Sequence, residues 1–321
     1  MCIRLSLTLL VTALTCSAIA NLANAAARDR VFVASYGNDA NPCTFLSPCK
    51  TFQQAVNVVA AGGEVTAIDS AGFGPITITQ AITITSPDGV EAGIVTSSGG
   101  NAITINAGLT DAVVLRGLTL NGSGGGANGV IFNSGGSLTV TNCVVQNFIW
   151  NGSSNRTGNG ILIQPASGAV NFVITNTIAA NNGLEGISYL PQSGSANANG
   201  VIDHVTVTNN FATGISVFTP ATTGTTSVAI SNSVSSNNGA EGIFISGGSG
   251  PLTVSIDNAA ISNNQTGIFA QDGTVFLGRS TFTRNPSANV VNSTANTFFS
   301  YKNNQFDQSI GTLLNTTLGL Q

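Results

Sequence analysis

Short runs of alternating apolar and polar residues follow one another along most of this chain. Typical runs are VAI at residues 228–230 and GIFI at residues 242–245, each bounded by Gly, Asn or Ser. Such runs are too short for helices and are rich in β-branched residues, a pattern that predicts strands. We therefore expect an all-β fold over most of the chain.

A longer repeat organises these strands in the second half of the chain. Two asparagines, a short linker and a Gly-Ile pair recur, and the glycines of this phrase lie 28, 28 and 25 residues apart, at Gly186, Gly214, Gly242 and Gly267. A unit of this length cannot bury its own core and must stack on its neighbours. One turn of a parallel β-coil per repeat meets this requirement, with turns about 4.8 Å apart.

Stacked turns place equivalent residues in columns along the axis. The glycine column, which we expect to supply corners with positive φ, contains Gly160, Gly186, Gly214, Gly242 and Gly267. The column expected to fill the interior contains Ile161, Ile187, Ile215, Ile243 and Ile268. A polar residue lies five places before each asparagine pair, and the sequence predicts an internal amide ladder from Asn142, Asn176, Asn232 and Asn258.

This combination of short strands, glycine corners and an asparagine ladder resembles the right-handed parallel β-helix of the pectin-lyase-like superfamily. The resemblance covers about residues 63–301 and implies an all-β solenoid. The superfamily includes lyases, hydrolases, isomerases, adhesins and tailspikes, so the resemblance implies an architecture and leaves the activity open.

Both ends of the chain differ from the repeat. Residues 1–25 have the features of a secretory signal peptide, namely Arg4, an apolar run and an Ala-x-Ala motif that ends at Ala25. We expect cleavage near Ala25, a secreted or periplasmic protein and no transmembrane segment after it. Lipoprotein processing at Cys16 is the alternative, which the preceding residues fit poorly. Residues 302–321 are expected to form a carboxyl-terminal cap or tail.

Residues 26–62 predict an amino-terminal cap. Cys43 and Cys49 flank a five-residue loop and are expected to form a disulfide in an oxidising compartment. Residues 51–60 have apolar positions at helical spacing and stop at Gly62. The resemblance implies that this short helix covers the open end of the first coil. Cys143 is then unpaired, and we interpret it as a small buried apolar side chain rather than a catalytic thiol.

Composition limits the classes of partner. Of the 321 residues, 42% are hydrophobic and 7% are charged, and the formal net charge is −4. Removal of the signal peptide with Arg4 leaves 8 basic and 13 acidic residues, a net charge of −5. Because no basic patch is present to neutralise phosphates, we do not expect nucleic acid as a partner. We also find no ligand spacing for a metal, expect no cofactor, and expect a monomer.

Two columns contain carboxylates that are candidate catalytic groups. Glu185 and Glu241 occupy the same corner two turns apart, about 9.6 Å from the strand spacing, near the separation of an inverting glycosidase pair. Two solvated corner glutamates are the simpler interpretation. The second column lies six places before the asparagine pairs and contains Thr175, Asp203, Ser231, Asp257 and Arg279. It suits a lyase, although Asp257 with Arg279 is equally an ordinary surface ion pair.

The remaining candidates are aromatic or basic. His204 is the only histidine; it follows Asp203 and stands at a ladder position, so it is either a general base or a substitute for asparagine. Trp150 is the only tryptophan and lies, with Arg156, on a loop expected to project, where it either stacks on a sugar ring or packs on the body. We favour a noncatalytic surface or glycan-binding module. The alternative is a polysaccharide lyase or glycoside hydrolase, for which catalytic residues are unknown and Asp203, Asp257 and Glu241 are the first candidates.

Overall fold

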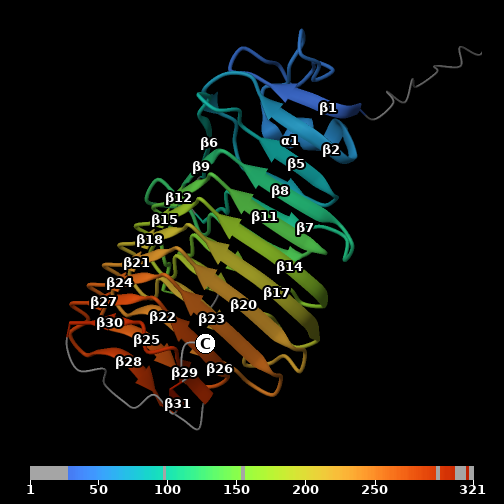
Figure 1. Ribbon diagram of the computed structural model, residues 1–321. Coiled ribbons are helices and arrows are strands. Elements are labelled where there is room, and N and C mark those ends of the chain that lie inside the picture. The colour runs from blue at the N-terminus through green and yellow to red at the C-terminus, as the bar shows by residue number, and fades with distance from the viewer. Residues whose placement is uncertain (1–27, 97–98, 153–155, 294–296, 308–315, 318–321) are drawn as a thin grey trace, which may run out of the picture.

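The computed structural model describes residues 28–96, 99–152, 156–293, 297–307 and 316–317. The predicted signal peptide, residues 1–25, lies outside this part of the chain. The described residues form a long stack of coils made of three parallel sheets (Figure 1).

The chain visits the three sheets in turn, once per coil. The 12-stranded sheet contains, in spatial order, β1 (Arg28–Val33), β2 (Val59–Ala67), β5 (Ile82–Thr85), β8 (Ala112–Arg116), β11 (Ser137–Thr141), β14 (Gly168–Thr175), β17 (Ser195–Asp203), β20 (Thr226–Ser231), β23 (Leu252–Asp257), β26 (Thr274–Gly278), β29 (Thr297–Ser300) and β31 (Thr316–Thr317). The 10-stranded sheet contains β3 (Ala71–Gly72), β6 (Ala92–Val95), β9 (Leu118–Asn121), β12 (Val144–Gln146), β15 (Ile178–Ala180), β18 (Thr206–Thr208), β21 (Val234–Ser236), β24 (Ala260–Ser262), β27 (Thr281–Thr283) and β30 (Gln305–Phe306). The 9-stranded sheet contains β4 (Ile76–Ile78), β7 (Ile103–Asn106), β10 (Val130–Ser134), β13 (Ile161–Ile163), β16 (Ile187–Tyr189), β19 (Ile215–Phe218), β22 (Glu241–Ser246), β25 (Thr266–Ala270) and β28 (Ala288–Asn292).

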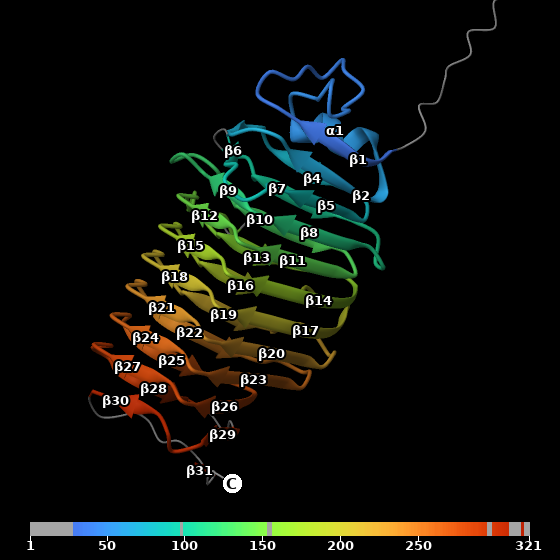
Figure 2. The same ribbon diagram turned by 45° about the horizontal axis from the view of Figure 1, so that its top comes forward.

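This arrangement confirms the predicted right-handed parallel β-helix. The short helix expected near the amino terminus is also present, as α1 (Phe52–Val58). The Thr51 side chain caps it by accepting a hydrogen bond from the backbone N–H of Gln54. Its buried residues face the first coil, where α1 packs against β1, β2 and β4 (Figure 2). Strand β1 precedes the helix in sequence and pairs in parallel with β2, so the 12-stranded sheet starts within residues 26–62.

The predicted aliphatic column is confirmed. Strands β13, β16, β19, β22 and β25 pair so that Ile161, Ile187, Ile215, Ile243 and Ile268 stand directly beside one another. None of these side chains exposes more than 1% of its surface. Branched side chains at this position therefore form a continuous row within the core along five coils.

The asparagine ladder lies at a different position from the one predicted. Asn142, Asn176, Asn232 and Asn258 are exposed, with φ between 49° and 54°. Their left-handed conformation forms the corner between the 12-stranded and 10-stranded sheets. The residue that follows each of these asparagines points inward instead. Thr177 and Ser233, which follow two of these asparagines, are 1% and 3% exposed. The prediction was right about the tight turn and wrong about burial.

The internal ladder is built from the second asparagine of each pair and from Asn285, which follows Arg284. Each amide nitrogen donates to the side-chain oxygen of the asparagine in the next coil at 3.0 to 3.3 Å. The same oxygen also accepts a hydrogen bond from the backbone N–H of the donating asparagine. At most 3% of each side chain is exposed. The members are Asn182, Asn210, Asn238, Asn264 and Asn285.

The predicted reason for the glycine column is also wrong. Gly186 and Gly214 are not among the glycines with positive φ. A Cβ atom on Gly186 would lie 2.8 Å from the side-chain nitrogen of Asn210 and 2.9 Å from the carbonyl oxygen of Gly214. It would also lie 2.2 Å from Cγ1 of Val207, so glycine is required because a core valine, the buried amide ladder and the next coil's backbone all pack against this position.

Candidate functional site

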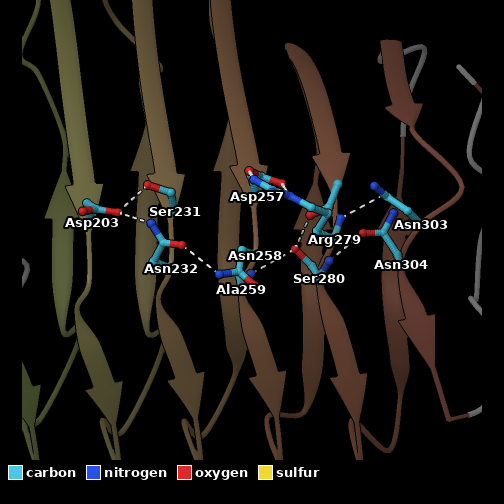
Figure 3. A network of polar contacts seen from close by, with 11 residues as sticks. Asp203, Ser231, Asn232, Asp257, Asn258, Ala259, Arg279, Ser280, Asn303 and Asn304 are labelled. Carbon is cyan, nitrogen blue, oxygen red and sulfur yellow. Dashed lines mark hydrogen bonds and ion pairs between the residues drawn. The ribbon is translucent and has the colours of Figure 1, made fainter. Parts of the chain in front are cut away.

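The acidic column at the carboxyl end of the 12-stranded sheet has nearly the predicted register. Thr175, Asp203, Ser231 and Asp257 stand side by side on β14, β17, β20 and β23. The next position is Gly278 rather than Arg279, because Asn285 matches the second asparagine of a pair and Arg284 matches the first, so a count of six from the first position ends at Gly278. Arg279 occupies the following left-handed corner, at φ 50°, and its Nε donates to Asp257 Oδ1 at 2.8 Å (Figure 3).

Asp203 accepts hydrogen bonds from three neighbouring side chains. The donors are Ser231 Oγ at 2.6 Å and Asn232 Nδ2 at 2.8 Å, and the ring nitrogen Nδ1 of His204 lies 2.6 Å away. These contacts, with that of Ser231 the largest, lower the pKa of Asp203 to about 2. The hydrogen bond and charge of Arg279 likewise lower the pKa of Asp257. Both carboxylates are ionised and engaged at neutral pH.

His204 stands at the corner position shared with the exposed asparagines. Its φ of 51° matches theirs, so it does substitute for asparagine in that column, although the column is exposed. The contact of Nδ1 with Asp203 leaves Nε2 directed away from that carboxylate. A shallow groove of about 380 Å³ runs along the column from His204 past Asn232 and Asn258 to Arg279. Asn258 Nδ2 donates to Asn232 Oδ1 at 2.8 Å along its floor.

Glu185 and Glu241 share a column as predicted. Each lies two residues before an isoleucine, Ile187 or Ile243, and both isoleucines stand in register with Ile215 of the coil between them. They do not form an equivalent pair. Glu185 accepts two hydrogen bonds from Arg156 Nη2, both at 2.9 Å, and is 9% exposed. Glu241 accepts one from Thr213 Oγ1 at 2.7 Å. Arg156 is thus engaged with Glu185 rather than presented to solvent with Trp150.

A shallow cavity of about 470 Å³ lies where the 10-stranded sheet turns toward the 9-stranded sheet. Exposed apolar side chains surround it: Phe211 is 69% exposed and Ile149, which with Phe211 lines the cavity, is 39% exposed. Trp150, next to Ile149, is 47% exposed. Amide side chains lie between them along the corner. We call this cavity the aromatic groove, lined by Gly124, Asn147, Phe148, Ile149, Asn181, Asn182, Gly183, Asn209 and Phe211.

Main-chain contacts between coils hold the aromatic groove in place. The N–H of Gly183 donates to the carbonyl of Phe148 at 2.7 Å, and the N–H of Phe211 donates to the carbonyl of Asn182 at 2.8 Å. Sequence reasoning found Trp150 but missed Phe211. The available signal was that Phe211 stands where the neighbouring repeats have Gly183 and Gly239.

The cysteines have structural positions. Cys43 and Cys49 are joined, with Cα atoms 4.6 Å apart. Cys143 is 2% exposed, and burial raises the pKa of its thiol to about 11, which confirms its interpretation as a buried side chain. Within the described ranges, no three His, Cys, Asp or Glu side chains group closely enough to hold a metal ion. The helix of this part of the chain is too short to cross a membrane.

No family model and no curated protein matches this sequence. Solved structures do match in shape. A pectate lyase, Pel9A, superposes with a TM-score of 0.56 at 15% identity, over 84% of this chain and 79% of its own. The chain has the pectin-lyase-like β-helix fold. A rhamnogalacturonan lyase matches at a TM-score of 0.47 and 11% identity, over 91% of this chain and 85% of its own. A GH136 lacto-N-biosidase from Eubacterium ramulus matches at a TM-score of 0.44 and 11% identity, over 86% of this chain and 67% of its own.

Proposed function

We propose that this chain is an exported, noncatalytic β-helix that binds a glycan in the aromatic groove. The observation that carries the proposal is the exposure of Phe211, 69% of whose surface is in water, in a groove that it lines together with Ile149 and a corner row of amides. The half-exposed Trp150 follows Ile149 in the chain. Aromatic rings bind the C–H faces of sugars, and amides exchange hydrogen bonds with sugar hydroxyls. A rigid groove with both groups suits an uncharged sugar chain.

The state of the carboxylates supports a binding role over a catalytic one. General acid catalysis needs a carboxyl group that is protonated near neutral pH. The pKa of Asp203 is lowered to about 2, and that of Asp257 is lowered by Arg279. Glu185 is paired with Arg156. Neither Asp203 nor Asp257 is in an environment that would make it a proton donor.

The charge of the chain selects the class of glycan. Without its signal peptide the chain has a net charge of −5, which disfavours long polyuronates through repulsion. Neutral chains avoid this repulsion. One protein of this fold is a pectate lyase, which is the reason to place polysaccharides first among the ligands tested.

Binding is tested with the chain from residue 26 onward on an array of neutral and acidic glycans. We expect retention on neutral glycans that Phe211→Ala and Trp150→Ala each weaken at least tenfold. Tyr36→Ala is the matched control, because Tyr36 is 68% exposed and lies in the cap, outside the aromatic groove. Retention that survives both Phe211→Ala and Trp150→Ala, or that Tyr36→Ala abolishes equally, contradicts the proposal.

The alternative is a polysaccharide lyase or glycoside hydrolase, and the contact between His204 and Asp203 is the observation that favours it. A carboxylate on Nδ1 fixes the ring so that Nε2 faces away and can accept a proton. The test is incubation with the same glycans, with and without calcium, following new reducing ends and unsaturated uronates. Product formation that is lost in Asp203→Ala or His204→Gln would establish the enzyme, as would loss in Asp257→Ala or Glu241→Ala.

A further inference from the structure

A second groove crosses the amino-terminal end of the 12-stranded sheet. Two cavities of about 330 and 400 Å³ lie there and share Arg30, Thr66 and Pro87 in their walls, so they form one continuous depression. We call it the cap groove. One half is charged, with Glu64, Asp88 and Arg116, and the other half is apolar, with Phe32, Phe45, Ala67 and Ile68.

The charges in the middle of the cap groove satisfy one another. Arg30 Nη2 lies 2.8 Å from Glu64 Oε1, and Arg30 Nε donates to Thr66 Oγ1 at 3.3 Å. Thr66 Oγ1 in turn donates to Glu64 Oε1 at 2.6 Å. This closed triangle forms a neutral part of the wall and leaves little charge there for a ligand.

At the charged end, Arg116 and Asp88 have no such partners. Neither side chain forms a hydrogen bond or ion pair with any residue of the described ranges. They are nevertheless held near each other, because the N–H of Ser86 donates to the carbonyl of Arg116 at 2.9 Å and Asp88 lies in the turn that follows. Thr66, Thr85 and Arg116 stand in register, so the cap groove spans about 9.6 Å between the first and last of these backbones.

The apolar end is an aromatic surface open to water. Phe45 is 58% exposed, and its ring meets the ring of Phe32 edge-on at 5.4 Å between centroids. The loop that carries Phe45 is closed by the bond between Cys43 and Cys49 and by the hydrogen bond from Phe32 N to Cys43 O at 2.8 Å. The exposed ring is therefore held in a fixed place, facing a groove that ends in one unpaired cation and one unpaired anion.

We propose that the cap groove binds a zwitterionic amphiphile, namely an α-amino acid or short peptide with an apolar side chain. Its carboxylate would bind the Arg116 guanidinium, a geometry that permits two parallel hydrogen bonds. Its ammonium group would bind Asp88, and its side chain would lie against Phe45 and Pro87. A single charge of either sign would satisfy only half of this end of the groove, whereas a zwitterion satisfies both halves. This site is separate from the aromatic groove and does not depend on glycan binding.

Titration calorimetry with the chain from residue 26 onward tests this assignment. The probes are L-phenylalanine and the dipeptide L-phenylalanyl-L-phenylalanine, which distinguish a free amino acid from a peptide as the ligand. Phenylpropionate lacks the ammonium group and phenethylamine lacks the carboxylate. Because the charged groups are open to solvent, we expect a dissociation constant of about 1 mM for the better of the first two probes. We expect roughly threefold weaker binding when either charge is missing.

Two exposed variants assign the contacts. Arg116→Gln should weaken binding of phenylalanine and phenylpropionate and leave phenethylamine unchanged, and Asp88→Asn should show the opposite selectivity. Arg284→Gln is the control, an exposed arginine outside the cap groove. Equal binding of all four probes, indifference of phenylalanine binding to Arg116→Gln, or no measurable heat from any probe would overturn the proposal. Retention on the glycan array in both variants would show that the aromatic groove is intact.

Discussion

Removal of one member of the internal asparagine ladder should destabilise the protein more than any exposed asparagine substitution. Asn238 lies in the middle of this ladder and is 3% exposed. Its Oδ1 accepts both the backbone N–H of Asn210 at 3.1 Å and the side-chain Nδ2 of Asn210 at 3.0 Å. Its Nδ2 donates to Asn264 Oδ1 at 3.0 Å. The other side-chain N–H of Asn210 donates to the carbonyl of Ala179. Asn238→Ala therefore leaves two N–H groups of Asn210, one on the backbone and one on the side chain, without an acceptor in the buried interior.

The expected cost follows from those two donors. Each buried donor left unsatisfied costs about 1 to 3 kcal/mol, so the loss of unfolding free energy should be about 2 to 6 kcal/mol. This is a large share of the roughly 5 to 15 kcal/mol that stabilises a typical domain. Asn237→Gly is the control at the adjacent position. Asn237 is exposed at φ 56°, which glycine adopts freely, and its side chain donates only a 3.4 Å hydrogen bond to Thr208 Oγ1.

Urea unfolding followed by circular dichroism measures both variants. We expect Asn237→Gly to change the unfolding free energy by less than about 0.5 kcal/mol, as is usual for surface sites. If the coils unfold in steps, the midpoint of the main transition is compared instead, because long repeat arrays can lose two-state behaviour. An Asn238→Ala midpoint that coincides with that of Asn237→Gly would refute the reasoning, since it would mean that the ladder contributes no more than a surface amide.

Three further predictions concern single positions. Gly214→Ala should cost about 1 to 3 kcal/mol in urea unfolding, because the new Cβ would lie 2.2 Å from Ser235 Oγ and 2.7 Å from both Asn238 Nδ2 and the carbonyl oxygen of Gly242. Gly72→Ala, with nothing within 4 Å, should be nearly neutral, and equal midpoints for the two would contradict this. The folded pKa of Asp203, about 2, lies below its unfolded value of about 3.9, so its contribution to stability is present above about pH 4 and is lost as the pH falls toward 2. The melting temperature of Asp203→Asn should therefore vary less between pH 4 and pH 2 than that of the parent protein. Cys143 should react with a thiol reagent only under unfolding conditions, because its thiol is 2% exposed and its pKa is raised to about 11 by burial; rapid labelling of the folded protein would disprove its burial.

The sequence predicted the features that depend on counting. The isoleucine column and the pairing of Asp203 with Ser231 follow from aligning the repeated asparagine and Gly-Ile phrases, and the structure confirms both. Arg279 was placed one residue too early because the count started from Asn285, which matches the second asparagine of a pair, while Arg284 stands at the first position. Counting from the repeated phrase therefore works where both asparagines of the pair are present, even when the coil length changes, and fails where another residue replaces the first of them.

The sequence did not distinguish the two kinds of corner asparagine. Asn232 and Asn238 are six residues apart, and both stand near a turn. One is in the left-handed conformation with its side chain in water, and the other bonds the next coil inside the core. An amide is suited to both positions, because it tolerates positive φ and also stacks in ladders. Only the direction of the backbone at each corner decides between them, and that direction is a property of the whole coil.

The candidate binding groups are departures from the repeat, and this is an argument for their function. A side chain at position 183 has no room, because a Cβ on Gly183 would lie 3.0 Å from the Cα of Ile149. The equivalent position 211 has a phenylalanine that is 69% exposed. The scaffold does not require this ring, since glycine serves the same corner in neighbouring coils, and exposing it to water is unfavourable. A ligand that covers the ring would remove that cost, so we expect Phe211→Gly to leave the unfolding midpoint nearly unchanged while abolishing retention on glycans. A large loss of stability in Phe211→Gly would instead show that the ring belongs to the scaffold.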